Sequence, residues 1–225
     1  MQELKERIVK EGKVLPGNII KVDGFLNHRI DTELMAHIAE EFGKHFNMDE
    51  VTMILTAEAS GIALSAIVAQ HFHKPMIFAK KAKSDNIEGG LYQSDIFSYT
   101  YKKKVTLLVS KEWLSADDKV LIIDDFMANG EAMRGLCDIV TAAGATLVGI
   151  GCAVEKGFQG GGDRLRAAGV NLKSLAIIES AEPGNIVFRD EEQSPLLPFQ
   201  PGRDRTEPAP LFSVSFCTKQ KEACP

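Results

Sequence analysis

Short apolar runs alternate with longer amphipathic segments along most of the chain, a pattern typical of strands that alternate with helices. The apolar runs predict strands over residues 51–55, 76–79, 105–109, 119–124, 146–154, 172–178 and 186–188. Helical spacing of apolar positions predicts helices over 3–10, 62–69, 131–143 and 163–168, and one more that is capped by Asp31. We therefore expect an α/β domain with a mainly parallel sheet flanked by helices. Its ligand site should lie beyond the carboxyl ends of the central strands.

The segment over residues 81–104 departs from this alternation because it is mostly polar. It contains the pair Gly89–Gly90, and apolar and polar positions alternate after it. This pattern predicts a mobile hairpin that projects from the domain.

The composition changes again near residue 190, and six of the nine prolines of the chain lie beyond it. We expect one domain over 1–189 and a flexible, proline-rich tail over 190–225. The alternation of Phe212, Val214 and Phe216 leaves open that part of the tail docks as an edge strand.

The composition is that of a soluble globular protein, with 44% hydrophobic and 25% charged residues. A net charge of −5 disfavours a nucleic acid as the main partner. No apolar run reaches the ~18 residues of a membrane span, and the charged N-terminus does not look like a secretion signal, so we expect a cytoplasmic protein. The four cysteines form no C-x-x-C pair or zinc spacing, so reduced thiols and no protein-held metal are expected. Trp113 is interpreted as a packing residue.

The segment from Val120 to Ala132 carries the clearest chemical signal: an apolar strand, the acidic pair Asp124–Asp125, a short loop and the start of a helix. Backbone N–H groups in the loop and in the first helical turn suit a phosphate. Gly130 allows close approach of the backbone, and Asn129 adds a side-chain hydrogen bond. Carboxylates repel phosphate but accept hydrogen bonds from sugar hydroxyls. Both carboxylates are expected to emerge at the end of the strand, beside the loop, so the segment fits a ribose 5-phosphate.

The same pattern leaves a simpler interpretation open. An acidic pair that ends a strand also occurs as a cation site or as part of a solvated loop. The segment is not a Walker A loop, because G-x-x-x-x-G-K-[ST] is missing, and it is not a dinucleotide fingerprint, because no G-x-G-x-x-G follows the strand.

This segment resembles the phosphoribosyl diphosphate signature of the type I phosphoribosyltransferases, with Asn129 where many members have threonine. The resemblance extends further in one branch of that family, the bacterial enzymes that use xanthine. It covers approximately residues 1–189, whereas the tail and the hairpin at 85–101 depart from the family. Four motifs in the same order carry it: VDGFLNH at 22–28, EASG at 58–61, IIDDFMANG at 122–130 and EKGFQ at 155–159.

The resemblance implies the type I phosphoribosyltransferase fold, a homodimer, and transfer of a phosphoribosyl group from phosphoribosyl diphosphate to xanthine, with Mg²⁺ carried by the diphosphate. It also implies roles for individual residues. Asp124 and Asp125 are the catalytic pair at the ribose hydroxyls, and Lys80 and Lys81 begin the mobile hairpin, or hood, with lysine replacing an arginine at Lys80. The 5-phosphate is held by Ala128, Asn129, Gly130, Glu131 and Ala132. The loop near the diphosphate is formed by Glu58, Ala59, Ser60 and Gly61.

The same resemblance assigns the purine base to Ile20, Asn27 and Lys156, with isoleucine replacing a leucine at Ile20. A lysine that follows an apolar strand suits a base that is partly anionic near neutral pH, and an amide offers the donor and the acceptor that an oxopurine edge needs. Phe158 either stacks on the base or packs under the glycine-rich turn. Glu58 would repel a diphosphate unless a magnesium ion or a backbone turn intervenes.

Two other functions stay open at this point. The first is a related transferase specific for hypoxanthine or guanine. The second is a regulator that keeps the phosphoribosyl diphosphate loop without catalysis, but such a protein usually adds a DNA-binding domain and a basic face, and the sequence has neither.

Overall fold

The computed structural model describes residues 1–81, 90–98 and 103–189, so the expectations for the tail at 190–225 lie outside the described residues. Within this part of the chain the main sheet has six strands in the order β10-β9-β8-β7-β3-β4. Five of them are parallel, and β10 is antiparallel to β9. The strands are β3 (Met53–Ala57), β4 (Met76–Ala79), β7 (Lys119–Met127), β8 (Thr146–Lys156), β9 (Leu172–Glu182) and β10 (Asn185–Phe188).

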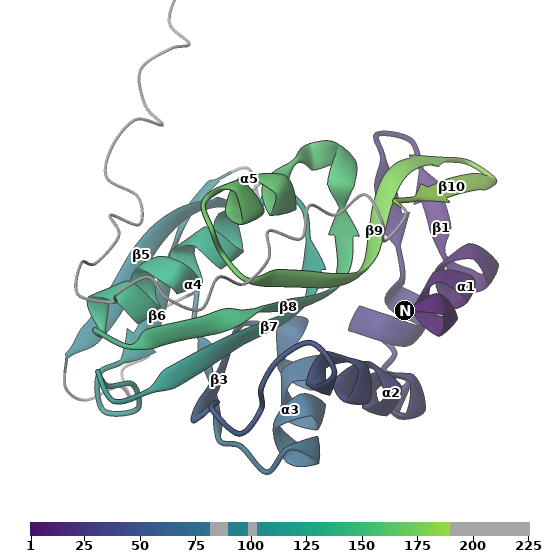
Figure 1. Cartoon of the computed structure of the whole chain (residues 1–225). Helices are drawn as coiled ribbons and strands as arrows, with labels where there is room; N and C mark the ends of the chain where they lie inside the picture. Colours follow the sequence, from purple (N-terminus) through teal and green to yellow (C-terminus); the bar gives the residue numbers. More distant parts are fainter. Residues whose placement is uncertain (82–89, 99–102, 190–225) are drawn as a thin grey trace, which may run out of the picture. The chain divides into compact units, whose positions relative to one another are not determined.

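Helices cover both faces of this sheet, with α2 and α3 on one face and α4 and α5 on the other (Figure 1). Each face encloses a buried apolar cluster, one around Phe42 and Ile54 and the other around Ile122 and Ile139. The sheet flanked by helices therefore confirms the predicted α/β class. The helices are α1 (Gln2–Glu11), α2 (Thr32–Gly43), α3 (Gly61–His71), α4 (Glu131–Ala142) and α5 (Gly161–Ala167).

Helix α2 begins where the sequence predicts, because the Asp31 carboxylate accepts the Leu34 N–H at 3.1 Å. Strand β7 runs three residues beyond the predicted end, to Met127. Trp113 is 60% exposed, so its interpretation as a packing residue was wrong. None of the helices in the described ranges has the length and apolar character needed to span a membrane.

The hairpin is formed by β5 (Leu91–Ser98) and β6 (Lys103–Ser110), which pair antiparallel. The strand predicted at 105–109 forms, but it is the second arm of this hairpin and not part of the main sheet. Helix α4 packs closely against the hairpin at Gly135, where a methyl group would lie only 3.0 Å from Leu107 Cδ1.

A second hairpin near the N-terminus was not predicted. Strands β1 (Lys13–Leu15) and β2 (Ile19–Lys21) pair antiparallel around the turn at residues 16–18. A single π-helical turn, η1 (Asp23–Asn27), follows and leads toward α2. Three-residue strands are too short to show an alternating pattern, so only the turn between them was recognisable in the sequence.

Candidate active site

Three loops meet at the carboxyl edge of the main sheet because they follow three adjacent parallel strands. The loop at 58–60 follows β3, the loop at 128–130 follows β7, and the short 3₁₀ helix η2 (Gly157–Gln159) follows β8. They are called here the diphosphate loop, the phosphate loop and the base loop, after the roles expected of them. In parallel sheets this edge is where ligands collect.

The acidic pair lies inside strand β7, between the phosphate loop and the core. Asp124 is 7% and Asp125 1% exposed, so the expectation that both carboxylates emerge at the end of the strand was wrong. Asp125 accepts a hydrogen bond from Ser60 Oγ at 2.8 Å, and its own N–H donates to Asp124 Oδ1 at 3.0 Å. Asp125 Oδ2 is buried and has no hydrogen-bond partner within the described chain, so this oxygen can accept a hydrogen bond from a ligand.

Burial and the neighbouring charge of Asp125 raise the pKa of Asp124 well above its usual value. Opposite Asp124 on strand β8 lies Cys152, whose thiol pKa is also raised, by burial first and then by the nearby carboxylates. Asp124 therefore lies in surroundings that disfavour negative charge, and a ligand that donates hydrogen bonds or brings positive charge is favoured there.

Gly61 brings the diphosphate loop against the acidic pair. A methyl group at this position would overlap both Thr56 Oγ1 and Asp124 Oδ1, so only glycine allows helix α3 to begin here. Thr56 was not singled out in the sequence. Its hydroxyl is buried without a partner in the described structure, and the only signal for it was a polar residue near the end of a buried strand.

Glu58 is hydrogen-bonded to the residues at the start of the hood. Its carboxylate accepts the Lys81 N–H at 2.5 Å, and its N–H donates to the Ala79 carbonyl at 3.1 Å. The peptide bond between Glu58 and Ala59 is cis. A backbone N–H thus donates to one carboxylate oxygen of Glu58. Of the two compensations considered for its charge, a magnesium ion or the backbone, the structure contains the backbone contact.

Lys80 links the diphosphate loop to the hairpin through its backbone. Its N–H and carbonyl exchange hydrogen bonds with Leu108 of β6 at 2.9 and 2.8 Å. Its side chain lines a groove of about 490 Å³ that also includes Met53, Phe78 and Trp113. Of the candidate residues, Lys80 is the one that lines this groove, and its expected role at the diphosphate stays a prediction.

The phosphate loop ends at the start of helix α4. Gly130 has φ +76°, a left-handed conformation that glycine adopts without strain, and α4 begins at the next residue, Glu131. Ala128, Asn129 and Gly130 are half-buried, and the first-turn residue Ala132 packs against the core below. The first N–H groups of a helix have no partners within the helix and suit an anion, and the phosphate site expected here stays a prediction.

The base loop lies beside the N-terminal hairpin. The Lys156 ammonium donates to the Asn18 carbonyl at 3.1 Å and lies 5.5 Å from the centre of the Phe126 ring. Burial lowers the pKa of Lys156. The bond to Asn18 brings the turn before Ile20 to the end of β8, although the Ile20 side chain itself is buried.

Asn27 and Phe158 lie close to the core on this side. Asn27 ends the π-helical turn η1 and is half-buried. Phe158 is half-buried in η2 and packs against the cluster that contains Phe25 and Phe42. The packing alternative for Phe158 is therefore present in the structure, and the exposed part of the ring stays available to a ligand.

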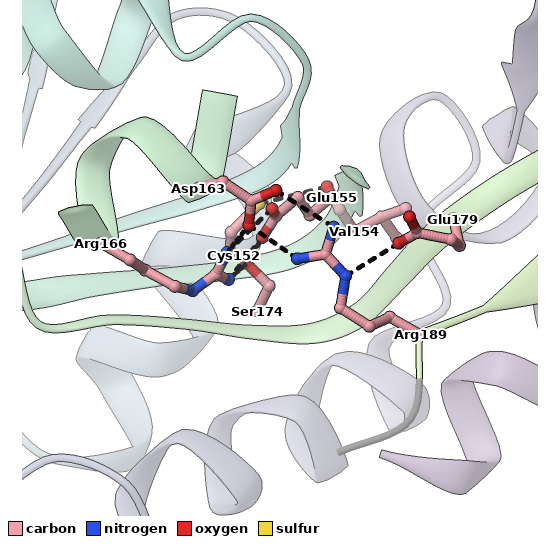
Figure 2. A network of polar contacts seen from close by, with 8 residues as sticks. All are labelled: Cys152, Val154, Glu155, Asp163, Arg166, Ser174, Glu179 and Arg189. Atoms are coloured by element: carbon pink, nitrogen blue, oxygen red, sulfur yellow. Dashed lines mark hydrogen bonds and ion pairs between the residues drawn. The ribbon is translucent and has the colours of Figure 1, made fainter. Parts of the chain in front are cut away.

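A polar network that the sequence did not predict lies beneath the base loop (Figure 2). Glu155, which directly precedes Lys156, is fully buried, and its two oxygens accept hydrogen bonds from Arg166 at 2.7 and 3.1 Å. Ser174 Oγ also donates to Glu155. The only signal in the sequence was an acid at the end of an apolar run, and nothing there identified its partners.

The network continues to the end of the described domain. Asp163 of α5 pairs with Arg189 at 2.6 Å, and Arg189 pairs with Glu179 of β9 at 2.8 Å. These contacts hold the Asp163 pKa below its usual value, with Arg189 as the main cause. Helix α5 is therefore joined to β8 through Glu155 and, through Arg189, to Glu179 of β9.

Comparison with known proteins agrees with this arrangement. The model of the family described as "Phosphoribosyl transferase domain" matches residues 25–168. The chain belongs to the phosphoribosyltransferase family. As a phosphoribosyltransferase it is 53% identical over 192 residues to a protein of Bifidobacterium animalis subsp. lactis named xanthine phosphoribosyltransferase, a match that covers 84% of this chain and all of that one. Proteins of the same name from Lachnoclostridium phytofermentans and Clostridium novyi are 52% and 46% identical, and they match over their whole length and 85% and 84% of this chain.

Solved structures of the family support the fold. Adenine phosphoribosyltransferase from Giardia lamblia, solved with 9-deazaadenine, superposes with a TM-score of 0.66 at 20% identity and covers 79% of this chain and 98% of its own. The enzyme from Saccharomyces cerevisiae gives a TM-score of 0.65 at 19% identity and covers 77% of this chain and 97% of its own. The type I phosphoribosyltransferase fold is thereby established for this transferase.

Proposed function

We propose that this phosphoribosyltransferase transfers the 5-phosphoribosyl group from phosphoribosyl diphosphate to xanthine and releases xanthosine 5'-monophosphate and diphosphate, a reaction of purine salvage. The observation that carries the proposal is the identity of 46–53% to proteins named for this reaction, over their full length. The proposal is supported by the placement of the phosphate loop, of the acidic pair within β7 and of Lys156 at the end of β8, because β7 and β8 are neighbouring parallel strands.

The sugar phosphate is assigned to the phosphate loop and the acidic pair. Ala128 to Ala132 offer backbone N–H groups to the 5-phosphate. Asp124 and Asp125 accept hydrogen bonds from the ribose hydroxyls, and the buried, unpartnered Asp125 Oδ2 is one oxygen available for this. In the reaction the bond from the anomeric carbon to diphosphate breaks as a purine nitrogen bonds to that carbon. Positive charge then develops on the ribose, and the nearby carboxylates stabilise it.

The diphosphate is assigned to the loop from Glu58 to Gly61, with Lys80 and Lys81 of the hood completing the site when the hood closes over it. Closure excludes water, which otherwise hydrolyses the activated sugar. Ser60 fits a supporting role because its hydroxyl already orients Asp125.

The residues present also fit Mg²⁺ that arrives with the diphosphate. Magnesium keeps several waters and binds through one or two carboxylates together with substrate phosphates, and the acidic pair supplies such carboxylates beside the diphosphate loop. When bound, the ion neutralises charge that develops on the departing diphosphate.

The base is assigned to Lys156, Asn27, Ile20 and Phe158. Xanthine differs from guanine by an oxygen acceptor in place of an amino donor and ionises more easily. The lysine ammonium suits that oxygen-rich edge, and its half-buried position strengthens the attraction. Asn27 adds an amide, and the exposed part of Phe158 offers a face for stacking.

We also propose that the enzyme works in the cytoplasm as a homodimer. The family resemblance implies the homodimer, and the cytoplasm is the compartment expected from the sequence. Sedimentation at assay concentration should give twice the chain mass, and a fully active monomer would contradict the dimer.

The function is tested by measuring diphosphate release with xanthine, guanine, hypoxanthine and adenine, each with and without Mg²⁺. Xanthine should exceed guanine by roughly tenfold to a hundredfold in kcat/KM, and adenine should give no measurable turnover. Turnover should require the metal ion. A larger kcat/KM for guanine or hypoxanthine would reassign the base, and no turnover with any purine would favour a regulator that only binds the sugar diphosphate.

A further inference from the structure

Helix α5 lies against both the phosphate loop and the base loop, and one side chain of the helix bonds to each of them. The Arg164 guanidinium donates from Nη2 to the Asn129 carbonyl at 2.9 Å. Its other terminal nitrogen, Nη1, donates to the Gln159 carbonyl at a longer 3.4 Å. Asn129 belongs to the phosphate loop and Gln159 to the base loop, so a single planar group spans the two.

The backbone of α5 supports the phosphate loop directly. At Gly161, the first residue of the helix, a methyl group would lie 2.6 Å from the Asn129 carbonyl carbon and 2.7 Å from the Gly130 nitrogen, and it would overlap the Ala128 carbonyl oxygen. The loop and the helix are therefore in contact at their main chains, and neither can shift toward the other.

The helix is also tied to the strand that carries the base loop. The buried pair of Glu155 and Arg166 joins α5 to β8 one residue before Lys156, and Asp163 joins it to Arg189 (Figure 2). Arg164 is therefore carried by a helix that is itself held in place by buried and partly buried ion pairs.

We propose that Arg164 is a positioning residue that couples binding of the sugar phosphate at the phosphate loop to binding of the base at the base loop. The proposal rests on the proposed function, which assigns a ligand to each loop. A guanidinium presents its donors in a rigid fork, so a shift of either carbonyl changes the geometry of the other hydrogen bond. Such coupling is reciprocal: whatever factor the sugar phosphate adds to base affinity, the base adds to sugar phosphate affinity.

The test measures the Kd of xanthine by calorimetry, first in the absence of a sugar phosphate and then with saturating ribose 5-phosphate. Ribose 5-phosphate cannot react because it carries no diphosphate leaving group. For the wild-type chain we expect xanthine to bind about tenfold more tightly with the sugar phosphate present. In Arg164→Met this factor should fall to about one to two, while the Kd of each ligand alone changes by less than about threefold. Arg164→Lys keeps the charge but offers a point donor in place of the fork, so most of the coupling should also be lost.

Lys10→Met is the matched control, because it removes one exposed positive charge on helix α1, and it should keep the wild-type factor. An unchanged factor in Arg164→Met, or a wild-type factor of one, would overturn the proposal. The proposal would also be overturned if Arg164→Met weakened the binding of each ligand by the same factor whether or not the other ligand was present. That result would indicate a purely structural role. If xanthine does not bind but another purine does, with coupling that depends on Arg164, the proposed substrate fails and the role of Arg164 stands.

Discussion

A negative charge on the Asp124 carboxylate is unfavourable in the folded protein because the group is buried. The same charge helps a reaction in which positive charge develops on the ribose. Because its folded-state pKa is raised, the folded chain binds a proton more tightly at this carboxyl than the unfolded chain does. Its contribution to stability is thus greatest below the ordinary carboxyl pKa and is lost as pH rises through the raised folded value. Function and stability have opposite requirements at this residue.

Asp124→Asn should therefore lower kcat by about two orders of magnitude or more and still melt a few degrees above the wild-type protein at pH 8. The difference in Tm should shrink as the pH is lowered toward 4, because the wild-type carboxyl is then protonated as well. Calorimetry across this pH range and steady-state assays measure both. Asp49→Asn, at an exposed site, is the control and should change neither property. Destabilisation by Asp124→Asn at every pH would show that the carboxylate is needed for folding.

Lys156 is the residue on which base preference is expected to depend. Burial lowers its pKa, so its ammonium loses the proton at a lower pH than an exposed lysine does, and affinity for anionic xanthine should decline on the alkaline side of that pKa.

Lys156→Met should reduce the ratio of kcat/KM for xanthine to that for guanine by about tenfold and remove the alkaline decline. The KM for phosphoribosyl diphosphate should change little. Profiles of kcat/KM against pH for both bases measure this, with Lys10→Met as the control. An unaltered ratio would remove Lys156 from the base site.

Helix α5 has only seven residues, but its first residue contacts the backbone of the phosphate loop. Gly161→Ala places a methyl group against the phosphate loop, and because that contact is between main chains, the loop must move. The KM for phosphoribosyl diphosphate should rise by at least about tenfold, and the Tm should fall by several degrees. At Gly24 a methyl group meets no atom within 4 Å, so Gly24→Ala should retain both values. A normal KM in a folded Gly161→Ala protein would mean that the phosphate loop tolerates displacement.

The elements also show which parts of the structure a sequence can reveal. The strand predicted over 119–124 was recognisable because a buried parallel strand is a continuous apolar run, and the loop before α4 was recognisable because a glycine follows that run. The contacts of Arg164 are to backbone carbonyls, which leave no side-chain pattern. The partner of Glu155 lies 11 residues away on another element, so only the fold brings them together.

For the whole molecule, the expected boundary near residue 190 leads to a simple experiment. The curated relatives match over their full length but cover only 84–85% of this chain, so they complete the fold without a counterpart to the remainder. Removal of residues 191–225 keeps Arg189 and its pairs with Asp163 and Glu179. The shortened chain should retain kcat, KM and Tm within experimental error. A large loss in any of them would assign a structural role to the tail.

Two buried thiols, Cys152 opposite Asp124 and Cys137 in α4, can report when this part of the domain opens. Burial raises the pKa of Cys137 to about 12 and that of Cys152 well above its usual value, and only the thiolate reacts quickly with disulfide reagents. Once Cys217 and Cys224 are replaced by serine, labelling of the two remaining cysteines should follow the rate at which the sheet opens. Since Cys152 lies opposite Asp124 across the β7–β8 ladder, a ligand held by the acidic pair should slow its modification, so occupancy of the site can be followed without a turnover assay.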